Sequence, residues 1–91
     1  MSYMVRKSEY EEMDPFTIIL AETIRRGLQE KGITQTKLGE KIGRTQAYVS
    51  PRYRGLLPWT TKDINLIAQA LGFANGFALI DEARGITKEG R

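Results

Sequence analysis

The segment 34–55 reads TQTKLGEKIGRTQAYVSPRYRG and predicts two short helices joined at Gly43. Thr34 and Thr45 each carry a hydroxyl group that can accept a hydrogen bond from an unpaired amide at a helix start. Gly43 can take the left-handed conformation that ends one helix and turns the chain sharply into the next. We therefore expect two helices that meet at a steep angle.

Gly39 lies in the middle of the first of these helices, where glycine costs about 1 kcal/mol relative to alanine. Its presence predicts that the second helix packs too closely there for a side chain. The apolar positions of the pair are Leu38, Ile42 and Val49.

A longer helix is predicted before this pair, from Pro15 to about Lys31. Asp14 is a good helix cap, and proline is tolerated at the first helical position because no amide partner is lost there. Apolar residues recur along this helix at the spacing of one face, which predicts that this face lies on a core. They are Phe16, Ile19, Leu20, Ile24 and Leu28.

Two helices are predicted after the pair. Thr60 and Asp63 resemble a capping box at the start of a helix that reaches Leu71. The last helix is expected from residue 75 or 76 to Gly85, which places one domain at 14–85 between flexible segments 1–13 and 86–91. Three aromatic residues are expected in the core rather than at a ligand site: Phe16, Tyr53 and Trp59.

The composition excludes several kinds of site. The 91 residues include no cysteine and no histidine, so zinc sites built from those ligands, thiol nucleophiles, disulfides and imidazole catalysis are excluded. No apolar run approaches the roughly 20 residues of a membrane helix, and the first residues lack the hydrophobic stretch of a secretory signal. We expect a cytoplasmic protein that is not an enzyme and has no cofactor, metal or small-molecule substrate.

Positive charge is concentrated around the helix pair. Residues 31–62 contain seven lysines and arginines against the single acid Glu40, whereas the whole chain carries +3. A charge run is usually a solvated surface, but here it coincides with the helix pair, which favours a nucleic-acid partner.

The run GITQTKLGEKIGRTQAYVSPRYRGLLPWTTKDINLIAQALG resembles the helix-turn-helix domain of the Cro/C1 repressor (XRE) family. The likeness covers about 41 positions and ends in the AxxLG pattern at 68–72. It implies an all-α, five-helix lambda-repressor-like domain, with the helix-turn-helix at about 34–55, that binds double-stranded operator DNA. The implied function is a transcriptional regulator of prokaryotic or phage type, associated with the nucleoid and acting as a repressor.

The resemblance also implies roles for individual residues. Gln46 begins the recognition helix, where its amide can bond bidentately to adenine, and Ala47 and Tyr48 would face the same groove. Gln35 would meet a phosphate at the amide end of the preceding helix and could brace Gln46. The remaining backbone contacts would come from Lys37, Arg44, Arg52 and Arg54. Each has a structural alternative: Gln46 as a solvated residue, Tyr48 folded back on the scaffold, the arginines simply exposed.

Two residues depart from the family pattern. Pro51 lies inside the recognition helix, lacks an amide and disfavours helical geometry at the residue before it, which predicts an early end or a kink. Arg52 stands where the family usually has an aliphatic core residue, so that Tyr53 or Leu56 is expected to fill that space.

Proteins of this architecture usually bind two half-sites about 34 Å apart as a symmetric dimer, so we expect a homodimer. The leading interface residues lie in or just before the last helix, although closing the core is an equal alternative for them: Phe73, Phe77, Leu79 and Ile80. The rival function is a protein-interaction module, such as an antitoxin or anti-regulator, that uses the same scaffold. Its binding surface would be Leu56, Leu57 and the last helix.

Overall fold

The computed structural model describes residues 14–89, and this range contains five helices and no strand. They are α2 (Pro15–Glu30), α3 (Gln35–Ile42), α4 (Gln46–Tyr53), α5 (Thr61–Ala70) and α6 (Gly76–Glu89). The prediction of an all-α fold is confirmed. The segment 1–13, predicted to be flexible, lies outside the described residues. Across 14–89, no helix combines the length and the apolar character that crossing a membrane would require.

Side chains cap the starts of α2 to α5, because the first amides of a helix have no partner within it. In each case a side-chain oxygen accepts a hydrogen bond from the amide three residues further along, at 2.8 to 3.2 Å. The capping residues are those that the sequence predicts: Asp14, Thr34, Thr45 and Thr60. The helix starts are therefore determined locally.

The turn between α3 and α4 depends on two glycines. Gly43 ends α3 with φ at 73°, a backbone conformation that residues other than glycine rarely adopt. A Cβ atom on Gly39 would lie 2.6 Å from the backbone carbonyl oxygen of Arg44. The expected obstacle at Gly39 was the second helix, but the nearest atom belongs to the turn itself, and Val49 of α4 is at an ordinary 3.7 Å. Gly39 thus allows the tight turn that sets α4 against α3.

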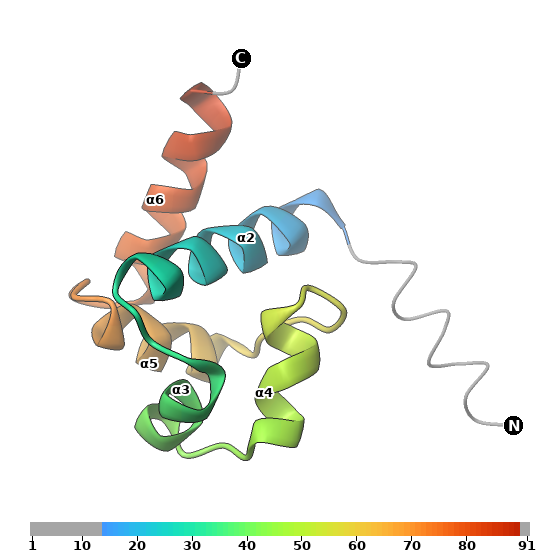
Figure 1. Cartoon of the computed structure of the whole chain (residues 1–91). Coiled ribbons are helices and arrows are strands. Elements are labelled where there is room, and N and C mark those ends of the chain that lie inside the picture. The colour runs from blue at the N-terminus through green and yellow to red at the C-terminus, as the bar shows by residue number, and fades with distance from the viewer. Residues whose placement is uncertain (1–13, 90–91) are drawn as a thin grey trace, which may run out of the picture.

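The helices pack in neighbouring pairs around one core (Figure 1). α3 packs on α4 and on α5, α2 packs on α4 and α6, and α5 packs on α6. In Figure 1, α3 and α4 lie below α2, and the last turns of α6 extend away from them. The buried apolar cluster comprises Leu20, Ile24, Leu28, Leu38, Ile42, Val49, Trp59, Ile64, Ile67, Ala68, Leu71, Leu79 and Ala83.

Two of the three aromatic residues expected in the core lie against it, and one does not. Trp59 is buried in the cluster, and Tyr53 is partly buried against it. The prediction for Phe16 is wrong, because its side chain is 57% exposed. Phe16 is only the second residue of α2, and its ring borders a hollow beside α6 instead of being covered by that helix.

Two helix boundaries differ from the pattern-based expectation. α4 continues through Pro51 to Tyr53, although proline removes the amide that would otherwise donate to the carbonyl of Ala47. α6 passes Gly85 and ends at Glu89, so the predicted boundary at 85 does not mark its end. Glycine weakens a helix by about 1 kcal/mol but does not by itself stop one.

Candidate functional site

The start of α4 presents an exposed edge to solvent. Gln46 and Ala47, the first two residues of α4, are both exposed. The side-chain oxygen Oε1 of Gln46 accepts a long hydrogen bond of 3.5 Å from the hydroxyl of Thr36, rather than a bond from Gln35. Within residues 14–89 the side-chain nitrogen Nε2 of Gln46 has no protein partner. Both hydrogen-bonding groups of this side chain can therefore turn toward a ligand.

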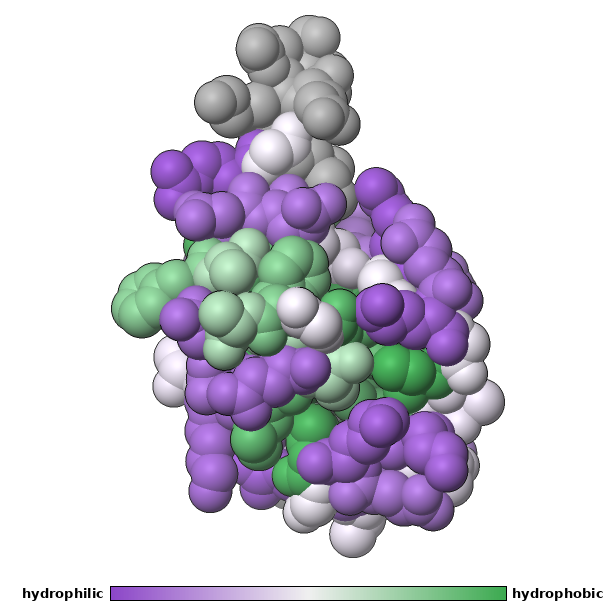
Figure 2. Space-filling model, turned by 90° about the vertical axis from the view of Figure 1, so that its left-hand side faces the viewer, coloured by the Kyte–Doolittle hydropathy of each residue, from purple (hydrophilic) through white to green (hydrophobic). Residues whose placement is uncertain are grey.

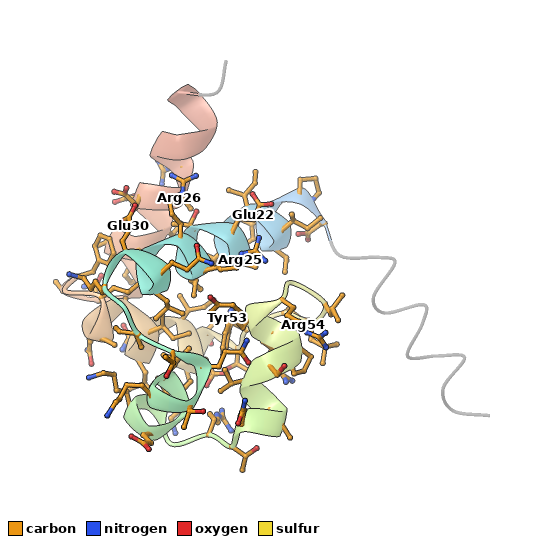
Figure 3. All side chains as sticks on the ribbon, in the orientation of Figure 1. Glu22, Arg25, Arg26, Glu30, Tyr53 and Arg54 are labelled. Atoms are coloured by element: carbon orange, nitrogen blue, oxygen red, sulfur yellow. The ribbon has the colours of Figure 1, made fainter. Side chains whose placement is uncertain are left out.

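Three residues predicted to contact a DNA backbone lie on α3 and at the far end of α4. Gln35 is half-exposed at the first position of α3, and Lys37, two residues further, is exposed and forms a 3.6 Å ion pair with Glu40. An exposed pair of this kind contributes little to stability. Figure 3 shows Arg54 on the side of α4 away from α3, while Tyr53 lies toward the body of the domain. Arg54 is exposed.

Arg44 and Tyr48 are arranged differently, because both bond to a buried carboxylate on α5. The Tyr48 hydroxyl donates to Asp63 Oδ2 at 2.6 Å, and Arg44 Nε donates to Asp63 Oδ1 at 3.0 Å. Asp63 has no exposed surface, whereas 35% of the Arg44 side chain is exposed. The Tyr48 ring packs against the core cluster, so Tyr48 folds back onto the scaffold, the alternative considered for it above.

Arg52 is also turned toward Tyr48. Its Nη1 donates to the Tyr48 carbonyl oxygen at 2.9 Å, and its guanidinium carbon lies 3.7 Å from the centre of the Tyr48 ring. The guanidinium carbon of Arg44 lies over the same ring at 4.4 Å. Both contacts are within the range of cation–π attraction. Of the two residues expected to fill the aliphatic position, Tyr53 packs against the core cluster, whereas Leu56 is exposed.

The charges of this network are set by their surroundings. Burial raises the pKa of Asp63, but hydrogen bonds from Tyr48, Arg44 and Thr60 lower it by more, so the pKa of Asp63 lies below its usual value. Burial, followed by the bond to Asp63, raises the pKa of the Tyr48 hydroxyl. Asp63 is thus a carboxylate and Tyr48 a neutral donor at neutral pH.

The capping-box pattern predicts only a role at the start of α5 for Asp63 and does not predict its bonds to Arg44 and Tyr48. Thr60 does cap α5 through the Asp63 amide, but the Asp63 side chain extends to α4 and to the turn before it. A signal was present in the spacing, since Asp63, Ile67 and Leu71 lie four residues apart on the buried face of α5. An acid on a buried face needs a cationic or hydroxyl partner.

The residues predicted for a dimer interface divide into two groups. Leu79 is fully buried within one chain and closes the core, which is one of the two alternatives considered for it. Phe77 is 81% exposed, and Phe73 and Ile80 are partly buried. Figure 2 shows hydrophobic side chains gathered on the side of the molecule that carries α5 and α6, with hydrophilic residues around them.

Two hollows of about 290 Å³ each adjoin Ile80 on this side. One is lined by Thr61, Ile64, Asn65, Asn75, Gly76, Phe77 and Ile80. The other is lined by Phe16, Ile19, Ile80, Ala83 and Arg84. We call the exposed Phe16 and Phe77, together with the partly buried Ile80, the apolar face.

Comparisons of the chain with protein-family models, with curated proteins and with solved structures gave no match.

Proposed function

We propose that the protein is a sequence-specific, double-stranded DNA-binding regulator of transcription that reads the major groove with the start of α4. The observation that carries the proposal is the exposed edge formed by Gln46 and Ala47 at the start of α4, with exposed cations on α3 and at the far end of α4. A glutamine amide bonds bidentately to adenine, and a small alanine leaves room for a thymine methyl group.

The electrostatics of this side of the molecule support the proposal. Lys37 and Arg54 are exposed on α3 and at the end of α4. Of the acids nearby, Glu40 is exposed and pairs with Lys37, whereas Asp63 is buried and presents no negative surface. Figure 3 shows Glu22 and Glu30 on the side of α2 that faces away from α3 and α4. A phosphate backbone would therefore meet a positive surface.

Titration of a fluorescent random-sequence duplex at several salt concentrations tests this proposal. The double variant Lys37→Ala plus Arg54→Ala should weaken binding to every sequence and flatten the plot of log K against log salt by about 2. The matched control is Arg26→Ala plus Arg84→Ala, which removes the same charge from α2 and α6. Equal effects of the two double variants, or no binding by the wild type, would reject the proposed site.

Sequence reading requires a second measurement. Duplexes selected from a random pool by the wild-type protein should lose about 1 to 3 kcal/mol of preference at one base pair when Gln46 is replaced by alanine. Binding to unselected DNA should change little, because Gln46 carries no charge. An unchanged preference would remove Gln46 from the reading surface.

We also propose that the regulator binds as a homodimer through the apolar face. Phe77 projects from the start of α6 and lines one of the two hollows, and large exposed apolar side chains of this kind commonly mark an interface. Sedimentation should give a dimer for the wild type and a monomer for Phe77→Ser. A monomeric wild type that does not bind DNA would favour the second candidate, a protein-interaction module, for which this face and the 38% exposed Leu56 would form the binding surface.

A further inference from the structure

Tyr48 lies between the exposed edge of α4 and the interior, and its polar atoms are engaged within the protein. Its hydroxyl donates to Asp63 and its carbonyl accepts from Arg52. Arg44 and Arg52, four residues before and after Tyr48, both lie over its ring. A base contact by the Tyr48 hydroxyl would require the 2.6 Å bond to a buried carboxylate to break.

Asp63 connects three separate parts of the chain. It lies in the first turn of α5 and bonds to Arg44, in the turn before α4, and to Tyr48, in the first turn of α4. Tyr48 directly follows Gln46 and Ala47, so the two bonds restrain the part of α4 that carries the exposed edge. Bonds from charged groups are stronger than neutral ones, and the absence of exposed surface at Asp63 excludes competing water.

We propose that Asp63 is a positioning residue for DNA reading: its buried carboxylate fixes the start of α4 through Tyr48 and Arg44, so that Gln46 meets the bases in one orientation. This inference rests on the proposed function. It assigns base contact to Gln46 and Ala47 alone. Tyr48 connects the start of α4 to α5 and does not contact the bases. Asp63 itself does not touch DNA.

The role of a positioning residue differs from that of a residue that only stabilises the fold. Loss of folded protein lowers the binding of all DNA sequences by the same factor. Loss of orientation lowers binding to the selected sequence while non-specific binding, which depends on phosphate contacts, is retained. The ratio of the two affinities therefore separates the roles.

The test compares Tyr48→Phe and Asp63→Asn with the matched control Asp81→Asn. Tyr48→Phe removes only the hydroxyl group and keeps the ring under both arginines. Asp81 is an exposed carboxylate that pairs with Arg84 on α6, so its substitution changes the charge as Asp63→Asn does. Each protein is titrated with a duplex selected by the wild type and with a random-sequence duplex, at a temperature where circular dichroism shows it folded.

We expect the affinity ratio of selected to random duplex to fall about tenfold in Tyr48→Phe and at least as far in Asp63→Asn, with no fall in Asp81→Asn. The salt dependence of random-duplex binding should match the wild type in Tyr48→Phe. Tyr48→Phe decides the result if Asp63→Asn does not fold. An unchanged ratio in a folded Tyr48→Phe would overturn the inference and leave the proposed function intact. No binding of any duplex by the wild type would overturn both.

Discussion

The two sides of α4 differ in how they are held. The inner side carries Tyr48, whose hydroxyl group donates to Asp63, and Arg52, whose Nη1 donates to the Tyr48 carbonyl oxygen. Both side chains are partly buried. The outer side carries Gln46 and Ala47, which are exposed and have at most one long hydrogen bond to the rest of the protein. The side of α4 with Tyr48 and Arg52 is therefore structural, and the side with Gln46 and Ala47 is left available to a ligand.

This difference shows why residue type alone is a poor guide to a binding surface. Arg44, Arg52 and Tyr48 are residues typical of DNA contacts, yet each forms a specific interaction inside the chain. Arginine bonded to a buried carboxylate is restrained and partly neutralised, so it attracts a phosphate less than an exposed lysine does.

Replacing Asp63 by alanine should have the largest effect on stability. It leaves the Tyr48 hydroxyl without its acceptor and Arg44 without its counter-charge, at a cost of about 2 to 4 kcal/mol in the free energy of unfolding. The value is below that for a fully buried pair because Arg44 is partly exposed and can be hydrated. Urea unfolding measures it. Asp81→Ala is the control and should change stability by less than about 0.5 kcal/mol.

Substitution of Gly39 by alanine should rank next, at about 1 to 3 kcal/mol. The new methyl group would lie 2.6 Å from the Arg44 carbonyl oxygen, and a backbone atom cannot move without displacing the turn. Because Arg44 is part of that turn, its bond to Asp63 should lengthen as well. Gly85→Ala is the matched control, since a Cβ there meets nothing within 4 Å. If both glycines tolerate alanine equally, the described turn geometry is incorrect.

Acid should weaken the inner side of α4. The pKa of Asp63 is lower in the folded protein than in the unfolded chain, so its stabilising contribution is complete above about pH 4 to 5 and is lost as the pH falls through the folded value. The stability difference between wild type and Asp63→Asn should be constant from pH 5 to 7 and should shrink below pH 4. A difference that grows on acidification would contradict the direction of the shift.

Breaking the exposed pair on α3 should have the smallest effect. Glu40→Gln removes the partner of Lys37, and the free energy of unfolding should change by no more than about 0.5 kcal/mol. Under the proposed function, the same change should tighten binding to random duplex, because Lys37 is released toward phosphate and a negative charge is lost. Tighter binding without a loss of stability would distinguish the exposed pair on α3 from the buried contacts of Asp63, whose loss lowers stability.

Much of the fold could be predicted because its signals are local. Asp14, Thr34, Thr45 and Thr60 cap their helices through atoms three residues away, and Gly43 turns the chain by its own conformation. These features need no knowledge of distant residues.

The errors and omissions concern residues whose surroundings come from elsewhere in the chain. Phe16 follows the apolar spacing of α2, but its ring borders a hollow beside α6 and stays exposed. Asp63 meets Arg44 and Tyr48 across 19 and 15 positions, a pairing that a helix cap pattern does not contain. The orientation of an arginine or tyrosine near a predicted site depends on such distant partners, so it follows only from the three-dimensional structure.

The most direct test of the proposed reading surface is a nuclear magnetic resonance titration of the isotopically labelled protein with a short DNA duplex. We predict that the largest backbone amide shifts occur at residues 35–37 and 44–48 and at Arg54, while the apolar face on α6 changes little at constant protein concentration. Largest shifts around Phe77 and Ile80, or no shifts at any salt concentration, would contradict the assignment of DNA binding to the start of α4.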